Sequence, residues 1–327
     1  MRLILRILTA LVLTLAVAIT VLAFLPGQKL AELVGQQIEK QTGRQVVFGG
    51  DVRFSFWPTL GIQADNVALA NADWAGPEPM LIAGRLVVGI DAADLIRGDV
   101  RITELTAIVP QLNLETRADG TGNWIFETPA TASDGGGGNG ATSDPIAIEA
   151  ITLSGASLRY APFGQEPVRL SQVDLSLLWP EPNGTATVDM TLRPAGKPLR
   201  LAGEIGSFSR FLAGDVVSVG LSVTAAASKA RLDGRADLTG AFDGRVTGAS
   251  EDTAALMGAL GLTPLVVPRG LGQRLQFAAD TTYTPDGRVA LRDLSLGLDQ
   301  NALTGVADLD FAAAPLRVTA DLTGGLL

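Results

Sequence analysis

The sequence contains no cysteine and no histidine in its 327 residues. Without cysteine there can be no disulfide and no thiolate metal site. Without histidine, Ser-His-Asp catalysis and HExxH zinc sites are excluded. Aromatic residues make up only 5% of the chain, so few large rings are available to anchor a compact core. We therefore expect a non-enzymatic protein with no cofactor and no metal site.

Basic residues are also scarce relative to acidic ones, and the net charge is −9. This balance argues against nucleic acid as a partner, because nucleic-acid-binding surfaces are rich in Lys and Arg. Any contact with lipid must then rest on apolar area rather than on a basic patch. Apolar residues make up 47% of the chain, and 38 glycines and 17 prolines indicate many turns.

A long apolar run follows the first few residues. Residues 7–25 carry no charged side chain, and Arg2 and Arg6 precede them. As a helix this run would measure roughly 28 Å, close to the bilayer hydrocarbon thickness of about 30 Å. By the positive-inside rule, the N-terminus stays in the cytoplasm and the rest of the chain is exported. We therefore predict a single-pass membrane anchor.

Two other interpretations of this run stay open. One is a cleaved signal peptide, with Val21-Leu22-Ala23 as the cleavage site. The apolar run is longer than the usual signal-peptide core of about 7–15 residues, which favours a retained anchor. The other is a buried helix of a soluble protein.

An amphipathic helix is predicted directly after the apolar run. Leu30, Leu33, Val34 and Ile38 recur at helical spacing, and charged residues lie mostly elsewhere on the helical wheel. Gly43 is a typical helix stop. We expect this helix to cap the first strands.

After this helix the apolar period changes from 3.6 to 2, which is typical of strands. Leu175 and Leu177, for example, alternate with Asp174 and Ser176, and similar segments follow one another to the end of the chain. The alternation predicts a mainly β protein in which a long antiparallel sheet has one apolar and one polar face.

Composition divides the chain into four segments. Residues 1–26 form the expected anchor, and 27–128 contain the first helix and the first strands, with a short helical turn near 91–96. Residues 129–145 are rich in Gly, Ser and Ala and are predicted to be a linker, because they have little to bury. Residues 146–327 form the longest strand region. Within it a helix is predicted near 251–262, with Ser250 as the candidate N-cap.

The strand region shows weak internal repetition. Gln172-Val-Asp-Leu-Ser-Leu resembles Arg292-Asp-Leu-Ser-Leu. Leu199-Arg-Leu-Ala-Gly, Ala230-Arg-Leu-Asp-Gly and Ala302-Leu-Thr-Gly also resemble one another. Each of these last three segments has a glycine in or just after a strand, and interior glycines permit bends and bulges. Repeated bends would curve a long sheet.

The apolar face of such a sheet must be covered. A second sheet would do so in a sandwich, and lipid acyl chains would do so in an open, curved sheet. Carboxylates such as Asp65, Asp189 and Asp308 mostly fall at polar strand positions or in turns. We interpret them as solvated surface groups rather than as catalytic acids.

Several short motifs together resemble the AsmA family of envelope proteins. They are Thr42-Gly43-Arg44, Gly49-Gly-Asp-Val-Arg53, Phe56-Trp57-Pro58, Leu95-Ile-Arg-Gly-Asp-Val-Arg-Ile102 and Gly122-Asn123-Trp124, followed by Arg292-Asp-Leu-Ser-Leu, Ala302-Leu-Thr-Gly and Ala307-Asp-Leu. Each motif alone is weak, and their order carries the resemblance, which extends over nearly the whole chain. Members of this family are commonly longer than this chain.

The resemblance implies a periplasmic β-groove that is anchored in the inner membrane and carries phospholipid toward the outer membrane. It also implies a link to outer-membrane protein assembly, and it supplies no catalytic residues. It favours the open groove over the sandwich. We expect the groove to be lined by Val52, Phe54, Phe56, Leu112, Leu114, Leu175, Leu177, Val188, Leu192, Leu201, Val219, Leu221, Leu232, Leu238, Leu294, Leu296, Leu298, Leu309 and Val318.

Two other functional hypotheses remain open at this point. One is a scaffold or assembly factor that binds outer-membrane proteins through its sheet edges without carrying lipid. The other is a carboxylate-based hydrolase. The expected partners are phospholipid, the inner membrane and outer-membrane assembly or receiving proteins.

Overall fold

The computed structural model describes residues 27–55, 60–91, 94, 102–126, 148–181, 183–263, 267–268, 270–313 and 315–326. The predicted anchor, the linker at 129–145, the Phe56-Trp57-Pro58 turn and most of the helical turn near 91–96 lie outside these ranges. No helix within them is both long enough and apolar enough to cross a membrane.

The described residues are mainly β, as predicted, and form 17 strands that belong to one mixed sheet with few helices. The chain divides into two compact units. Unit 1 comprises residues 1–148 and 153–169, and unit 2 comprises residues 149–152 and 170–327. Each unit is described by itself below.

The described residues of unit 1 form one long helix and the first strands. Its elements are α2 (Gly27–Thr42), β1 (Val46–Phe48), β2 (Val52–Ser55), β3 (Gly61–Leu69), β4 (Leu81–Ile90), β5 (Ile102–Ile108), β6 (Gln111–Glu115) and most of β7 (Ala150–Ala161). Strands β1 and β2 both pair with β3, and β4 pairs with β3 on one side and with β5 and β6 on the other. All of these pairings are antiparallel.

The pairing of β6 with β7 is parallel, which corrects the prediction of a wholly antiparallel sheet. A parallel neighbour requires a crossover connection of a dozen or more residues. Residues 116–149 supply that length between the two strands. Period-2 alternation is the same in parallel and antiparallel strands, so the sequence pattern carried no signal for this reversal.

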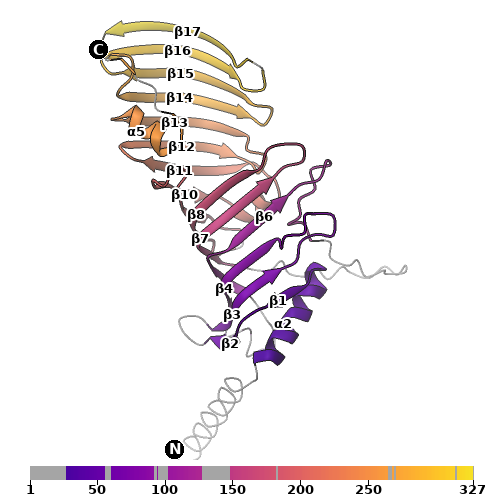
Figure 1. Ribbon diagram of the computed structural model, residues 1–327. Coiled ribbons are helices and arrows are strands. Elements are labelled where there is room, and N and C mark those ends of the chain that lie inside the picture. Colours follow the sequence, from indigo (N-terminus) through magenta and orange to yellow (C-terminus); the bar gives the residue numbers. More distant parts are fainter. Residues whose placement is uncertain are drawn as a thin grey trace, which may run out of the picture. The chain divides into compact units, whose positions relative to one another are not determined.

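Helix α2 ends where the sequence predicted. Gly43 adopts a positive φ of 68° and donates its N–H to the Glu39 carbonyl at 2.8 Å, a helix termination that glycine adopts without strain. The helix contacts β1 and β2, beside which it lies in Figure 1. Ala31 packs against a core of Val52, Ala64 and Val67. The predicted capping of the first strands is therefore confirmed.

Unit 2 is an up-and-down meander. Its strands are β8 (Val168–Leu178), β9 (Ala186–Leu192), β10 (Leu199–Ile205), β11 (Val217–Ala225), β12 (Ser228–Ala236), β13 (Phe242–Ser250), β14 (Leu275–Thr284), β15 (Arg288–Leu298), β16 (Asn301–Asp310) and β17 (Arg317–Leu326). Each strand pairs antiparallel with the next. Figure 1 shows β10 to β17 stacked in chain order.

Strand β12 shows how the sequence produces this sheet. Five residues of β12 are partly buried, namely Ser228, Ala230, Leu232, Gly234 and Ala236, and the alternate residues Lys229, Arg231, Asp233 and Arg235 are exposed. Successive side chains of a strand point to opposite faces, so the alternation separates an apolar face from a polar one. The small core of this unit, formed by Ala279, Leu294 and Ala307, lies on the apolar side.

Two short helices interrupt the meander. Helix α5 (Thr253–Ala259) falls within the predicted range, but its N-cap is Asp252, whose side chain accepts the Ala255 N–H. Ser250, the candidate N-cap, instead ends β13 and accepts a hydrogen bond from the Ser228 hydroxyl at 2.8 Å. Helix α4 (Phe208–Leu212) was not predicted, because five residues are too few for a helical period to be recognised.

Two of the repeated glycines have a steric reason. Gly203 of β10 has a φ of 159° and Gly305 of β16 a φ of 153°. A Cβ atom at either position would lie 2.0 Å from a carbonyl oxygen of the next strand, that of Gly220 or Asp321 respectively. Only glycine permits this approach between strands.

Candidate functional site

One face of unit 2 is apolar from β8 to β17. Paired residues of adjacent strands share a face, so the register traces it: Leu177 lies opposite Val188, and Leu221 lies opposite Leu232. We call this surface the apolar face and its reverse the polar face. The apolar face continues across the sheet through Val246, Phe277, Leu296, Leu303, Leu309 and Val318.

The described strands leave this face largely uncovered. They all belong to one sheet, so they supply no second sheet to pack on it. Leu294 is 5% exposed, but Leu221, Leu232 and Leu296 are only partly buried, and Val318 is 56% exposed. A sandwich core would bury leucines at these interior positions. The sandwich interpretation is therefore wrong for unit 2.

Most of the predicted groove residues of unit 2 do share the apolar face. Val188 and Val219 are buried there, and Val219 lies on β11, the strand that α4 contacts. The predicted residues on this face are Leu175, Leu177, Val188, Leu192, Leu201, Val219, Leu221, Leu232, Leu294, Leu296, Leu298, Leu309 and Val318.

Leu238 is the exception among the predicted residues of unit 2. It lies in the turn between β12 and β13 and is 51% exposed. Strand β12 ends at Ala236, so alternation extrapolated beyond that point does not place a side chain on a face.

In unit 1 the predicted residues lie on a sheet face that α2 partly covers. Val52 and Phe54 lie opposite Ala64 and Ile62, and all four belong to or pack against the core beneath α2. Leu112 and Leu114 lie on β6, opposite Leu158 and Tyr160 of β7. Phe56 lies outside the described residues.

The polar face of unit 2 carries Arg–Asp pairs between neighbouring strands. Arg200 of β10 binds Asp189 of β9, with Nε and Oδ1 2.9 Å apart. Such exposed pairs add little stability each, but they mark this face as the solvated one. Equivalent pairs join Arg193 to Asp174, Arg245 to Asp280 and Arg292 to Asp308, at 2.8–2.9 Å.

An arginine partner lowers the pKa of two of the paired carboxyl groups. The hydrogen bond from Arg200 lowers the pKa of Asp189, and that from Arg85 lowers the pKa of Asp65 in unit 1. A general acid at neutral pH requires a raised pKa, which is the opposite shift. Within the described ranges, moreover, no three acidic side chains are grouped so as to hold a metal ion.

The structure reveals a buried polar cluster in unit 1 that the sequence did not predict in this form. Asn123 is fully buried, accepts the Glu115 N–H at 3.0 Å, and donates to the Asn113 carbonyl and the Asn71 side chain at 2.7 and 2.8 Å. It fixes the loop after β3 onto β6. Within the Gly122-Asn123-Trp124 motif, Asn123 is therefore a hydrogen-bonded anchor.

Arg44, from the Thr42-Gly43-Arg44 motif, is also buried in unit 1. Its guanidinium lies 5.1 Å from the Phe126 ring centroid and 3.4 Å from both the Met80 sulfur and the Ile125 carbonyl oxygen. Burial lowers its pKa. Arg44 lies two residues after the end of α2, and its contacts with Ile125 and Phe126 join that helix to the segment after Asn123.

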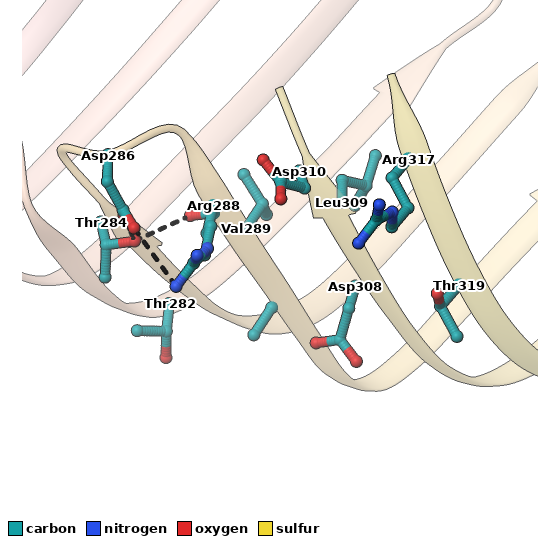
Figure 2. A pocket seen from close by; sticks show the side chains of 11 residues that line it. Thr282, Thr284, Asp286, Arg288, Val289, Asp308, Leu309, Asp310, Arg317 and Thr319 are labelled. Carbon is teal, nitrogen blue, oxygen red and sulfur yellow. Dashed lines mark hydrogen bonds and ion pairs between the residues drawn. The ribbon is translucent and has the colours of Figure 1, made fainter. Parts of the chain in front are cut away.

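A shallow cavity of about 470 Å³ lies at the hairpin ends of β14 to β17. Figure 2 shows that charged and hydroxyl side chains, among them Arg288, Asp308, Arg317 and Thr319, dominate its lining. Arg288 is 3.4 Å from Asp286, and Asp308 is paired with Arg292. The cavity is on the polar face.

Comparison with known families identifies the chain. The AsmA family model matches residues 1–191, more than half of its length. The chain belongs to the AsmA family. A search of curated proteins and one of solved structures returned no match.

Membership in the AsmA family confirms the resemblance over residues 1–191, and the motifs at residues 292–309 lie beyond the match. The matched residues include all of unit 1 and extend through β8 and most of β9. Together with the large β-sheet, AsmA family membership fits a lipid-transport role in the cell envelope.

Proposed function

We propose that this protein binds phospholipid on the apolar face of unit 2 and passes it across successive strands, from the inner membrane toward the outer membrane. The observation that carries the proposal is the partial exposure of leucines in the interior of the sheet, such as Leu221 and Leu232. Residues 1–26 serve as the inner-membrane anchor, and the bulk of the chain lies in the periplasm.

Acyl chains match this surface in chemistry and energy. Each methylene removed from water contributes about 0.8 kcal/mol, so two ordinary acyl chains bind favourably without specific contacts. The head group remains in water beyond the edge of the apolar face. No directional polar recognition is required, in agreement with the mostly aliphatic composition of that face.

Movement across successive strands requires many sites of similar affinity, because one tight site would trap the lipid. The apolar face repeats Leu, Val and Ala from strand to strand. Ten strands at about 4.8 Å spacing extend roughly 45 Å across unit 2, which is longer than one lipid. A lipid can therefore exchange one set of leucines for the next in small steps.

The test is mass spectrometry of organic extracts from the full chain purified in a mild detergent. Co-purifying phospholipid at near-stoichiometric amounts is the expected result. A lipid-free protein that retains a stable envelope-protein partner would instead favour the scaffold hypothesis.

A further inference from the structure

The burial of β11 changes along its length. Its side chains on the apolar face are, in chain order, Val217, Val219, Leu221, Val223 and Ala225. The first two and the last are 4–7% exposed, whereas Leu221 and Val223 are only partly buried. In the other described strands of the meander, at most one end is buried in this way. Both ends of the apolar face are therefore covered at β11, and its middle is open.

Helix α4 covers one of these ends. It lies between β10 and β11 in the chain and contacts β11. Its Phe208 is buried, with its ring centroid 5.0 Å from that of Trp179, and donates its N–H to the Gly184 carbonyl at 3.0 Å. Ser218, on the polar face of β11, is exposed, so the helix lies on the apolar side. From there α4 reaches back to the turn between β8 and β9.

Helix α5 covers the opposite end. It starts shortly after β13, and a Cβ atom at Gly261, just past its end, would lie 3.8 Å from the Ala195 Cβ in the turn between β9 and β10. Its seven residues measure about 10 Å, and with the flanking residues they cross the three strand spacings from β13 to β10, about 14 Å. In Figure 1 the helix lies at one end of these strands. Ala225 and Ser250 are buried on the apolar face, while Thr224 on the polar face is exposed, so α5 also lies on the apolar side.

Each helix carries a leucine that stays exposed. Leu212 comes one turn after the buried Phe208 and so shares its side of α4, yet it is 56% exposed. Leu260 stands in the same relation to the partly buried Leu256 of α5 and is 39% exposed. Both leucines thus continue the packed side of their helix without full cover, as does the strip of sheet between the two helices.

We propose that α4 and α5 form the two side walls of the lipid groove and narrow it at β11. Lipid tails pass over Leu221 and Val223. Leu212 contacts them from one wall, and Leu260 contacts them from the other. This arrangement rests on the lipid-binding function proposed above and adds a constriction to it.

The constriction also sets the direction of the acyl chains. Leu221 and Val223 lie about 7 Å apart along the strand. An acyl chain measures at least about 15 Å, half the hydrocarbon thickness of a bilayer. It is therefore too long to lie along β11 between the walls and must cross β11 toward the neighbouring strands, which is the direction in which the lipid has to move.

Photo-crosslinking of the full chain in its membrane tests the walls. A photoreactive amino acid at Leu212 or Leu260 should give phospholipid adducts. Arg210 and Ala254 are exposed controls on the opposite sides of α4 and α5, and adducts there should be severalfold fewer. Equal labelling of leucines and controls would overturn the walls alone, and so would an absence of lipid from both leucines while Leu232 is labelled. An absence of lipid at Leu232 as well would overturn both proposals.

A bulky substitution tests the constriction. Val223→Trp fills the open middle of β11, whereas Leu296→Trp adds bulk on β15, whose ends are not buried. With a photoreactive amino acid at Leu175 or at Leu309, on either side of both sites, Val223→Trp should lower lipid labelling at Leu309 severalfold relative to Leu175. Leu296→Trp should leave that ratio unchanged. Circular dichroism checks that both variants keep their β content, and equal ratios in the two variants would overturn the constriction.

Discussion

Leu221 of β11 lies directly opposite Leu232 of β12, and both side chains stay partly exposed although their strands are paired on both sides. Facing leucines in the interior of a sheet are ordinarily covered by a second layer. The residues behind them, Ser222 and Arg231, also lie opposite each other and form part of the polar face. Whatever covers these leucines must therefore bind on their own face of the sheet, and we place acyl chains there.

A charge on this face should prevent lipid binding without unfolding the protein. Leu232→Glu places a carboxylate where an acyl chain would lie, so co-purifying lipid should fall severalfold. Because Leu232 is partly exposed without lipid, the free energy of unfolding should change by no more than about 1 kcal/mol. Lipid phosphorus assays and urea titration measure the two effects, and Leu175, Leu177 and Leu296 should behave in the same way.

The matched control for this variant is Thr247→Glu, on the polar face of the neighbouring strand β13. It should leave the lipid content unchanged. If Leu232→Glu abolished cooperative unfolding, the leucine would belong to a closed core and the open-face account would fail.

Alternation along a strand is local, and it was therefore readable from the sequence. The phase of Leu175 and Leu177 against Asp174 and Ser176 placed these side chains on their correct faces. Topology is not local. The parallel pairing of β6 with β7 depends on a long connection. Neither strand's sequence indicates in which direction that connection crosses the sheet.

Glycine at position 305 should be essential for strand pairing. Gly305→Ala would place a Cβ atom 2.0 Å from the Asp321 carbonyl oxygen, at a φ of 153°. We expect a loss of about 2–3 kcal/mol in the free energy of unfolding, measured by thermal or urea denaturation. Gly248→Ala serves as the control, because its nearest contact would be an ordinary 3.6 Å. Equal stability of the two variants would contradict the close-approach explanation.

Asn123 should be the most sensitive polar residue of unit 1. Asn123→Ala leaves the Glu115 N–H and the Asn113 carbonyl without their buried partner, at a cost of about 3 kcal/mol. Urea unfolding of the full chain, followed by tryptophan fluorescence, would measure it, since Trp124 is adjacent. Gln111→Ala on β6 is exposed and should cost less than about 0.5 kcal/mol. A similar, small effect for both would refute the anchoring role.

Asn123 also shows where sequence reasoning stopped. The sequence singled out Asn123 only as part of a family motif, whereas its three hydrogen-bond partners come from residues 71, 113 and 115. Only the folded loop brings these groups together. Ser250 is a similar case, since its hydroxyl accepts a hydrogen bond from Ser228 on the neighbouring strand β12 instead of capping a helix.

Low pH should destabilise the turn between β15 and β16 of unit 2, because it protonates Asp299. Its carboxylate accepts the backbone N–H groups of Gly270, Gly272, Gln273 and Arg274, and these bonds lower its pKa to about 2. A carboxyl group normally titrates near pH 4 when unfolded. Its contribution is therefore fully present above about pH 4 and is lost as the pH falls through 2.

Asp299→Asn isolates this charge, because asparagine also tolerates the positive φ of 57° at this position. The variant should be less stable at neutral pH, and the difference from the parent chain should shrink between pH 4 and pH 2. Denaturation curves across that range provide the measurement. A difference that stays constant with pH would rule out the titration of Asp299 as the cause.

The most direct test of the open apolar face is site-specific photo-crosslinking of the full chain in its membrane. A photoreactive amino acid at Leu232 reports the apolar face, and one at the adjacent Arg231 reports the polar face of the same strand. The account predicts phospholipid adducts at Leu232 and none at Arg231. Protein adducts at Leu232 without lipid, or equal lipid labelling at both positions, would contradict it.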